Sequence, residues 1–524
     1  MSDNTALQKH RIRLTWHLVL EGLWAIALVG LPITSFTFLA QLTGALTAPF
    51  SALPVLFLLV FYCLPLILRG ASLPRESFVL VVFIFVVLIA SAQAFFIDIP
   101  TFKGKTVIDQ ETRSLLTLAV GISFYVVFAM LPNSRLRLQK TWQWINVGGM
   151  LALGFAMIQA YFIFRRADFY PAWFQTIQDF FVYESPQLTL WHRRVNGLTY
   201  EASWFAHQMV LLYLPLWFAA TFQNSSAFRF RLWRFSLENL LLVVAIFFFF
   251  LSSPRVGLVS FLLIIGYLFL LVNLRLIKRI SQAITRLPAL QHSPARRLLS
   301  GLIVAGISVL VLAFYLGLFA GAVYLSSQRD ERLALLIEST FTWQELWGAL
   351  TLNEYFLLLV SLRLVFVERM IYWITGWHIF QLFPLLGVGL GNAGFFFPSQ
   401  LPAAAWTSVE VRNVLYRIKA FPNVKSLWTR LLAETGIVGF AVFITWVYIL
   451  FRSALLSYRS QDRLIKTFAL AGQLCLVALL AEGFSIDSFA MPYLWVTAGL
   501  VSATGFIYRQ ELQQPAGEKN QSGA

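Results

Sequence analysis

Apolar and polar positions follow one another along this chain in long blocks, not at the short periods of a soluble helix or strand. Apolar runs of about bilayer length recur from end to end, separated by polar segments. The hydrocarbon core of a membrane is about 30 Å thick, which about 20 apolar residues span as a helix. The pattern therefore predicts twelve transmembrane helices, at about 17–40, 52–68, 77–97, 114–132, 141–164, 203–222, 238–252, 257–274, 298–325, 431–451, 467–487 and 488–508.

Composition supports this fold class. Of the 524 residues, 59% are hydrophobic and 12% are charged, whereas soluble domains are about 45–50% apolar and about 25% charged. A soluble enzyme, a disordered chain and a disulfide scaffold are excluded, and an all-α membrane protein is predicted. The first apolar run follows Lys9, Arg11 and Arg13. It is too long for the core of a signal peptide, so we expect a retained helix.

The formal net charge of +16 raises nucleic acid as a partner. Its distribution argues against that. With the N-terminus in the cytoplasm, the predicted cytoplasmic segments hold 23 of the 40 basic and 6 of the 24 acidic residues, a balance of +17, and the rest of the chain has −1. Basic residues collect on the cytoplasmic side of membrane proteins. The excess therefore indicates orientation and contact with anionic membrane lipids, with both termini cytoplasmic and no nucleic acid bound.

This topology divides the chain into helices and loops. A first outward loop interrupts the first nine helices, a second and larger one precedes the last three, and a polar tail ends the chain. We therefore expect helices over 1–325 with an outward loop near 165–202, a large extracytoplasmic helical loop over 326–430, helices over 431–508 and a disordered cytoplasmic tail over 509–524.

One further apolar stretch, 343–366, carries Glu345, Glu354 and Arg363. Counting it as a span would place the basic segment 452–466 outside the cell. We therefore interpret it as helix that packs on, or dips into, the outer leaflet. A re-entrant pair is the alternative.

The outward half of the chain is almost neutral overall but contains local groups of cations. Arginine binds phosphate through two parallel hydrogen bonds, so a lipid-linked diphosphate is the anion expected at this depth. The exposed cations can also be interpreted as interfacial anchors or as a solvated face. Arg255, in a turn between two helices, lies at a depth where charged residues are usually functional. The candidates are Arg193, Arg194, Arg255, Arg369, Arg417, Lys425 and Arg430.

Two other features are less informative. Gly389, Gly391 and Gly394 match GxGxxG, but no βαβ unit surrounds them, as a dinucleotide site requires. A tight turn at the membrane surface is the better interpretation. The sequence also lacks metal-ligand spacings such as HExxH or CxxC, so we expect no metal site and no cofactor.

Four segments, in their order along the chain, resemble the O-antigen ligase and O-antigen/exopolysaccharide polymerase superfamily. They are RVNGLTYEASWFA (194–206), SPRVG (253–257), ERMIYW followed by PLLGVGLGNAG (368–394), and LAETGIVGF (432–440). A large loop before the last three helices is also similar. The resemblance covers about 190–440 by motif and the whole chain by topology.

This resemblance implies a polytopic, GT-C-like membrane glycosyltransferase of the bacterial inner membrane. Its donor would be a glycan on polyprenyl (undecaprenyl) diphosphate, used without a metal at the outer face of the membrane. Arg194 and Arg255 would hold the diphosphate, since fixed cations stabilise the charge that grows on the leaving group. A flippase and a chain-length regulator are partners that the resemblance implies.

The attacking hydroxyl of the acceptor also needs a base. Ligases of this superfamily carry a histidine about nine residues before the Glu that corresponds to Glu434, and this chain has Lys425 there. A lysine acts as a base only if its pKa falls, which leaves Lys425 and Glu201 as alternatives. The predicted catalytic residues are Arg194, Arg255, Glu201 and Lys425, and the predicted substrate-binding residues are Arg193, Arg369, Arg417 and Arg430.

The missing histidine favours a polymerase over a ligase. We therefore predict an inverting, metal-independent polysaccharide polymerase that transfers a growing glycan from its lipid diphosphate to a lipid-linked repeat unit. The alternative within the superfamily is a ligase that transfers glycan to lipid A–core or another acceptor. The rival class is a solute or anion transporter, which should show repeated halves and helices broken at mid-membrane.

Overall fold

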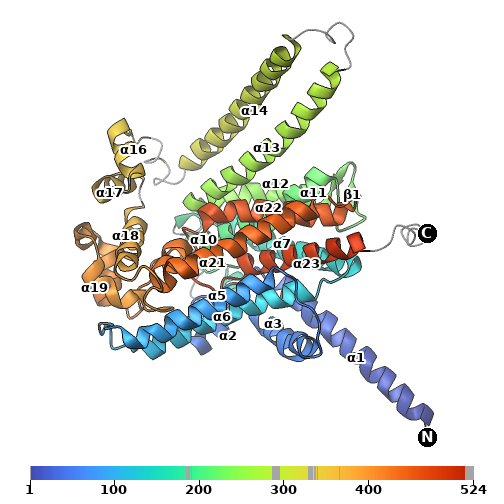
Figure 1. The fold of residues 1–524 in the computed structure, drawn as a ribbon, viewed down its shortest axis with the longest axis horizontal. Helices are drawn as coiled ribbons and strands as arrows, with labels where there is room; N and C mark the ends of the chain where they lie inside the picture. Colours follow the sequence, from blue (N-terminus) through green and yellow to red (C-terminus); the bar gives the residue numbers. More distant parts are fainter. Residues whose placement is uncertain are drawn as a thin grey trace.

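The computed structural model describes residues 2–183, 189–190, 192–285, 295–328, 334, 338, 340–364 and 366–513. Within these ranges the chain is a bundle of α-helices (Figure 1). The strands of the described residues are β1 (Arg231–Leu232) and β2 (Phe235–Ser236), which form one antiparallel hairpin. The prediction of an all-α fold is confirmed.

Long helices make up most of the bundle. They are α1 (Ser2–Val29), α5 (Ser77–Gln93), α6 (Val107–Met130), α7 (Arg135–Phe164), α12 (Leu237–Leu251), α13 (Arg255–Thr285), α14 (Ala295–Ser327), α21 (Leu427–Ser457), α22 (Arg463–Glu482) and α23 (Pro492–Gln513).

Shorter helices connect or extend these. Before α12 lie α2 (Thr37–Thr43), α3 (Ala52–Leu58), α4 (Leu64–Leu68), α8 (Ala172–Phe181), α10 (Ala202–Gln208) and α11 (Leu214–Gln223). Between α14 and α21 lie α16 (Trp343–Leu350), α17 (Glu354–Arg363), α18 (Val367–Leu382), α19 (Phe397–Gln400) and α20 (Val409–Arg412). A π-helical turn joins α3 to α4, and another joins α10 to α11.

Eight helices in the described part of the chain are long and apolar enough to cross a membrane. All eight coincide with predicted apolar runs, and the full count of twelve stays a prediction. They are Ser77–Phe96, Val107–Met130, Arg135–Phe164, Ala202–Gln223, Arg255–Arg275, Ser308–Leu325, Leu427–Ser457 and Arg463–Glu482, and three shorter apolar helices are Trp16–Val29, Ala52–Leu68 and Leu237–Leu251.

Small residues let neighbouring helices approach closely, as is typical of membrane bundles. Where α6 packs on α23, Gly121 lies against the indole of Trp495 and Gly499 lies against Phe128. A Cβ atom at either glycine would overlap its neighbour. The centre of the bundle is formed by α22 and by α10 with α11, most of whose side chains are buried.

The two ends of the bundle differ. The start of α1 and the end of α23 lie at one end in Figure 1, and α16 to α19 lie at the opposite end. The first, which we call the terminal end, holds basic residues of the predicted cytoplasmic segments in ion pairs: Arg135 lies 3.0 Å from Asp462, and Arg509 lies 2.8 Å from Glu76. The second we call the distal end; it comprises the ends of helices near residues 194–202, 252–256 and 482–487 together with residues 340–364 and 366–426.

The distal end carries a helical lobe in place of a span over 343–366. This stretch forms α16 and α17, of 8 and 10 residues, and each is too short to cross a bilayer. Arg363 Nη1 donates to Glu345 Oε2 at 2.8 Å and holds the two helices together. At the other end of the chain, α23 continues to Gln513 and so includes the start of the predicted disordered tail; residues 514–524 of that prediction lie outside the described residues.

Candidate active site

Arg194 fixes the turn that leads into Arg255. Its Nε donates to the carbonyl oxygen of Ser252 at 2.8 Å, and its Nη2 donates to that of Ser253 at 2.9 Å. These carbonyls end α12, and Ser253 has a positive φ of 46° before Pro254 starts the next helix. The first two motifs of the sequence, far apart along the chain, therefore meet here, and Arg194 sets the place of Arg255.

Helices α10 and α13 begin side by side at this turn. A Cβ atom on Gly257 would lie 3.1 Å from Ala206 Cβ, so the two backbones are close. Arg255 stands at the first turn of α13 and is half-buried, and Glu201 stands just before α10 and is exposed. The Glu201 carboxylate accepts a hydrogen bond from Ser203 Oγ. A cation and a carboxylate thus enter the same end of the bundle on adjacent helices.

Beneath this pair lies a buried polar triad on three helices. Glu482, the last residue of α22, contacts His207 Nδ1 with one oxygen and accepts from Ser260 Oγ at 2.6 Å with the other. His207 and Glu482 are 2% and 1% exposed, and Ser260 is fully buried. Because unpaired buried polar groups are costly, these contacts hold α10, α13 and α22 in register directly below Arg255.

Replacing Glu482 by Ala is expected to destabilise the protein strongly. It leaves the buried His207 ring nitrogen without its partner and removes one of the two acceptors of Ser260 Oγ, and an unsatisfied buried polar group costs about 1–3 kcal/mol. Thermal unfolding of the purified protein in detergent should show a clearly lower midpoint. Glu482→Gln, which keeps a hydrogen-bonding group of the same size, should lower the unfolding midpoint less. Ser260→Ala should lower the free energy of unfolding by about 1 kcal/mol. An unchanged midpoint for Glu482→Ala would contradict a stabilising role of the triad.

A second polar group is centred on Lys425. Its Nζ donates to Glu410 Oε1 at 2.6 Å and lies 4.5 Å from the centre of the Tyr372 ring. Tyr372 Oη donates to the same carboxylate at 3.4 Å. Burial, with the negative charge of Glu410, raises the pKa of the Tyr372 phenol, so this hydroxyl keeps its proton. Lys425 Nζ and Tyr372 Oη thus both donate to the Glu410 carboxylate.

This second group is attached to the first through the end of α22. Arg369 Nη1 donates to the carbonyl of Lys425 at 3.4 Å. Leu427 N–H donates to the carbonyl of Gly483 at 2.7 Å, next to Glu482 of the triad. One turn beyond Arg369, Trp373 packs on Phe484 with ring centres 5.1 Å apart. The structure thus brings Arg194, Arg255, Glu201, Arg369 and Lys425 to one end of the bundle, around the C-terminus of α22.

The third and fourth motifs also pair with each other. Helix α21 is broken at Gly436, which has a φ of 62°. The loop before α19 lies across this break: Val388 N–H donates to Ala433 O at 3.0 Å, and Gly389 N–H to Glu434 O at 3.0 Å. Gly389 and Gly391 have φ of 85° and 90°, so the predicted tight turn is confirmed. Its N–H groups at 388 and 389 are used within the protein.

Arg430 is buried in contacts with other helices. It is 7% exposed, donates from Nε to Glu434 Oε2 at 2.9 Å and from Nη1 to Asp487 O at 2.6 Å, and its guanidinium lies 4.9 Å from the centre of the Phe489 ring. These contacts favour a part in holding α21 to the segment after α22. Its predicted role in substrate binding stays a prediction.

The two remaining candidates lie on the surface of the distal end. Arg193 is exposed and has a positive φ of 52°, next to Arg194. Arg417 is exposed at the end of a π-helical turn. The loop after Arg417 is held by Lys103, whose Nζ donates to Ile418 O at 2.7 Å and to Ala420 O at 2.8 Å. Both arginines face solvent or membrane surface, and their predicted roles stay predictions.

Sequence reasoning missed the triad of His207, Ser260 and Glu482. A signal for Glu482 was present, since a carboxylate near the end of an apolar run is a candidate functional residue. Nothing in the sequence indicated that His207 and Ser260 would be its partners. In the described part of the chain, His, Cys, Asp and Glu side chains form no group of three that could hold a metal ion.

Comparison with known families agrees with the motifs. Residues 240–444 match the family described as O-antigen ligase. The matched segment runs from α12 into α21 and includes Arg255, Arg369, Lys425 and the broken helix, whereas Arg194, Glu201 and Glu482 lie outside it. A comparison with curated proteins gave no match. The match over residues 240–444 supports an assignment to the O-antigen ligase and polymerase superfamily.

Proposed function

We propose that this protein is a metal-independent, inverting polysaccharide polymerase of the bacterial inner membrane, with its distal end at the outer face. Its donor is a glycan on polyprenyl diphosphate, and its acceptor is a lipid-linked repeat unit. The observation that carries the proposal is the convergence of Arg255, Arg369 and Lys425 with the Arg194 turn around the C-terminus of α22. A basic site at one end of a membrane bundle suits a diphosphate whose lipid chain stays in the bilayer.

The chemistry follows from the charges. A hydroxyl of the acceptor sugar attacks the anomeric carbon from the side opposite the diphosphate, and Glu201 takes its proton. The bond from the anomeric carbon to the diphosphate oxygen breaks, and the leaving diphosphate keeps the electron pair. Arg255 and Arg369 stabilise the negative charge that develops on it. This stabilisation is strongest in a site that is partly closed to water. Glu201 later releases its proton to solvent.

Lys425 has a different role in this proposal. Its Nζ donates to the Glu410 carboxylate and lies over the Tyr372 ring, so the amine is engaged as a donor. A protonated amine cannot accept the proton of the acceptor. We therefore assign Lys425 a role in positioning the diphosphate site. Glu201, an exposed carboxylate just before α10, is assigned the role of base.

A ligase is the second candidate, because the matching family is described by that activity. The two differ in the acceptor: a polymerase extends a glycan on a second lipid-linked unit, and a ligase moves glycan to a different molecule. Lys425 at the position of the ligase histidine supports the polymerase.

The test is a reconstituted transfer assay. Purified protein in liposomes receives a lipid-linked repeat unit, and the products are separated by size. A polymerase yields a ladder of longer glycans on lipid, and the ladder should disappear with Arg255→Ala. Transfer only to an added lipid A–core acceptor would identify a ligase. Solute flux through the liposomes without any glycan product would refute both and favour a transporter.

A further inference from the structure

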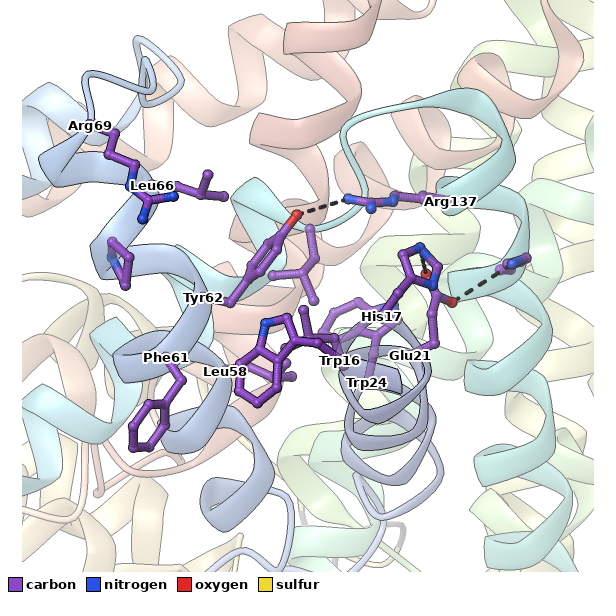
Figure 2. Close-up of a pocket in the computed structure, with 14 residues that line it drawn as sticks. Trp16, His17, Glu21, Trp24, Leu58, Phe61, Tyr62, Leu66, Arg69 and Arg137 are labelled. Carbon is purple, nitrogen blue, oxygen red and sulfur yellow. Dashed lines mark hydrogen bonds and ion pairs between the residues drawn. The ribbon is translucent and has the colours of Figure 1, made fainter. Parts of the chain in front are cut away.

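A cavity of about 510 Å³ lies at the terminal end, and none of its lining residues belongs to the candidate active site. It is enclosed by α1, by α3 and α4 with the π-helical turn between them, and by the start of α7 (Figure 2). Its size is within the range of small-molecule sites, about 300–1,000 Å³. No part of the proposed transfer reaction uses it.

One side of this cavity is apolar and aromatic. Trp24, Leu58 and Leu131 are buried in its wall, and Trp16 and Phe61 are exposed at its edge. Phe61, Leu64 and Leu68 point outward from the bundle around it. Such exposed apolar side chains on helices of a membrane bundle face lipid, so the cavity is reached from the bilayer.

The other side is basic. Arg69, Arg137 and Lys140 line it together with one carboxylate, Glu21, which lies 3.7 Å from Lys140 Nζ. Figure 2 shows Arg69 and Arg137 on either side of Tyr62, and Arg137 Nη1 donates to Tyr62 Oη at 3.3 Å. Guanidinium groups have five N–H donors in a fixed plane, so this single bond leaves Arg137 able to bind an anion. The positive charge therefore exceeds the negative charge on this side.

We propose that this cavity binds one anionic phospholipid of the cytoplasmic leaflet. The phosphate of this lipid lies between Arg69 and Arg137, and the part of an acyl chain next to the head group lies against Trp24 and Leu58. A soluble anion would not need the apolar wall, and a neutral lipid would not need the cations. Basic pockets between helices at the cytoplasmic end of a bundle suit anionic head groups.

The test uses the full-length protein in detergent, stripped of lipid and mixed with phosphatidylglycerol or phosphatidylcholine of the same acyl chains. Native mass spectrometry measures how much lipid stays bound. Phosphatidylglycerol should be retained at least ten-fold better. About 1 kcal/mol per basic residue near a membrane surface corresponds to about a five-fold loss of affinity for each arginine removed, so Arg69→Ala with Arg137→Ala should weaken binding about 25-fold.

A matched control removes two basic residues of the same end outside the cavity, Arg229→Ala with Arg231→Ala, and should leave binding unchanged. Arg69→Glu alone, an exposed position where folding is not at risk, should weaken binding more than Arg69→Ala. Equal retention of both lipids, equal losses in the control pair, or equal competition by free glycerol phosphate would each overturn the proposal.

Discussion

Arg255→Ala should abolish polymer formation while the protein still folds and inserts. Removing one donor that stabilises developing charge costs about 10²–10³ in rate, and Arg255 enters the site from the first turn of α13. The measurement is the initial rate of ladder formation in proteoliposomes with matched protein amounts. Arg255→Lys, which keeps the charge but loses the planar pair of donors, should retain part of the activity.

Arg113→Ala is the control for this variant. Arg113 is an exposed arginine near the start of α6, also at the distal end, and its removal lowers the local positive charge by the same amount. Its rate should stay within about two-fold of the unmodified protein, since exposed charges contribute little. Near-full activity of Arg255→Ala would show that this residue does not contact the leaving diphosphate.

Glu201→Gln should lower the rate by about 10²–10⁴, the usual contribution of a general base. The amide has nearly the shape of the carboxylate and can still accept from Ser203, so the start of α10 should be unaffected. Donor binding should also be unaffected, because the base acts on the acceptor. A binding measurement with the lipid-linked donor alone, beside the rate measurement, separates the two steps.

The matched control is Asp168→Asn, at an exposed carboxylate in the loop between α7 and α8. It should leave both the rate and donor binding unchanged. Glu410→Gln addresses the other carboxylate of the site: it releases Lys425, so it should weaken donor binding more than it slows transfer. If Glu410→Gln abolished transfer while Glu201→Gln left the transfer rate unchanged, Glu410 and not Glu201 would have the role of base.

The two groups around α22 explain why these variants should differ. Arg194 acts on the backbone of the turn before Arg255, and Glu482 holds three helices below it. Substitutions at either residue are therefore expected to affect transfer indirectly, by shifting the position of Arg255. Changes at Arg255 and Glu201 act on the donor and the acceptor themselves.

Much of the fold could be predicted from the sequence because it depends on a one-dimensional property. The length and spacing of the apolar runs predict helices, since a backbone in lipid must satisfy its own hydrogen bonds. The distribution of basic residues identified 343–366 as non-spanning, because a span there would place the basic segment 452–466 outside the cell. It did not predict that this stretch forms two helices, α16 and α17, with a capping box at Thr342 and Glu345.

The site was predicted only in part. Motif order pointed to Arg194, Arg255, Glu201 and Lys425, but the sequence left open which of the last two was the base. The contact of Lys425 with Glu410 depends on a loop that returns to the bundle 15 residues later, and spacing along the chain cannot indicate such a contact.

By itself, then, the sequence determined the fold class and predicted the sidedness and the family, because hydrophobic length, basic residues and motif order are local along the chain. Tertiary structure alone decided that Arg194 binds the turn before Arg255, that His207 and Ser260 share Glu482, and that Arg430 is buried against Asp487 and Phe489. These contacts join helices as much as 275 residues apart. Which polar groups meet across a bundle depends on helix packing, and any of several neighbours could have satisfied each group.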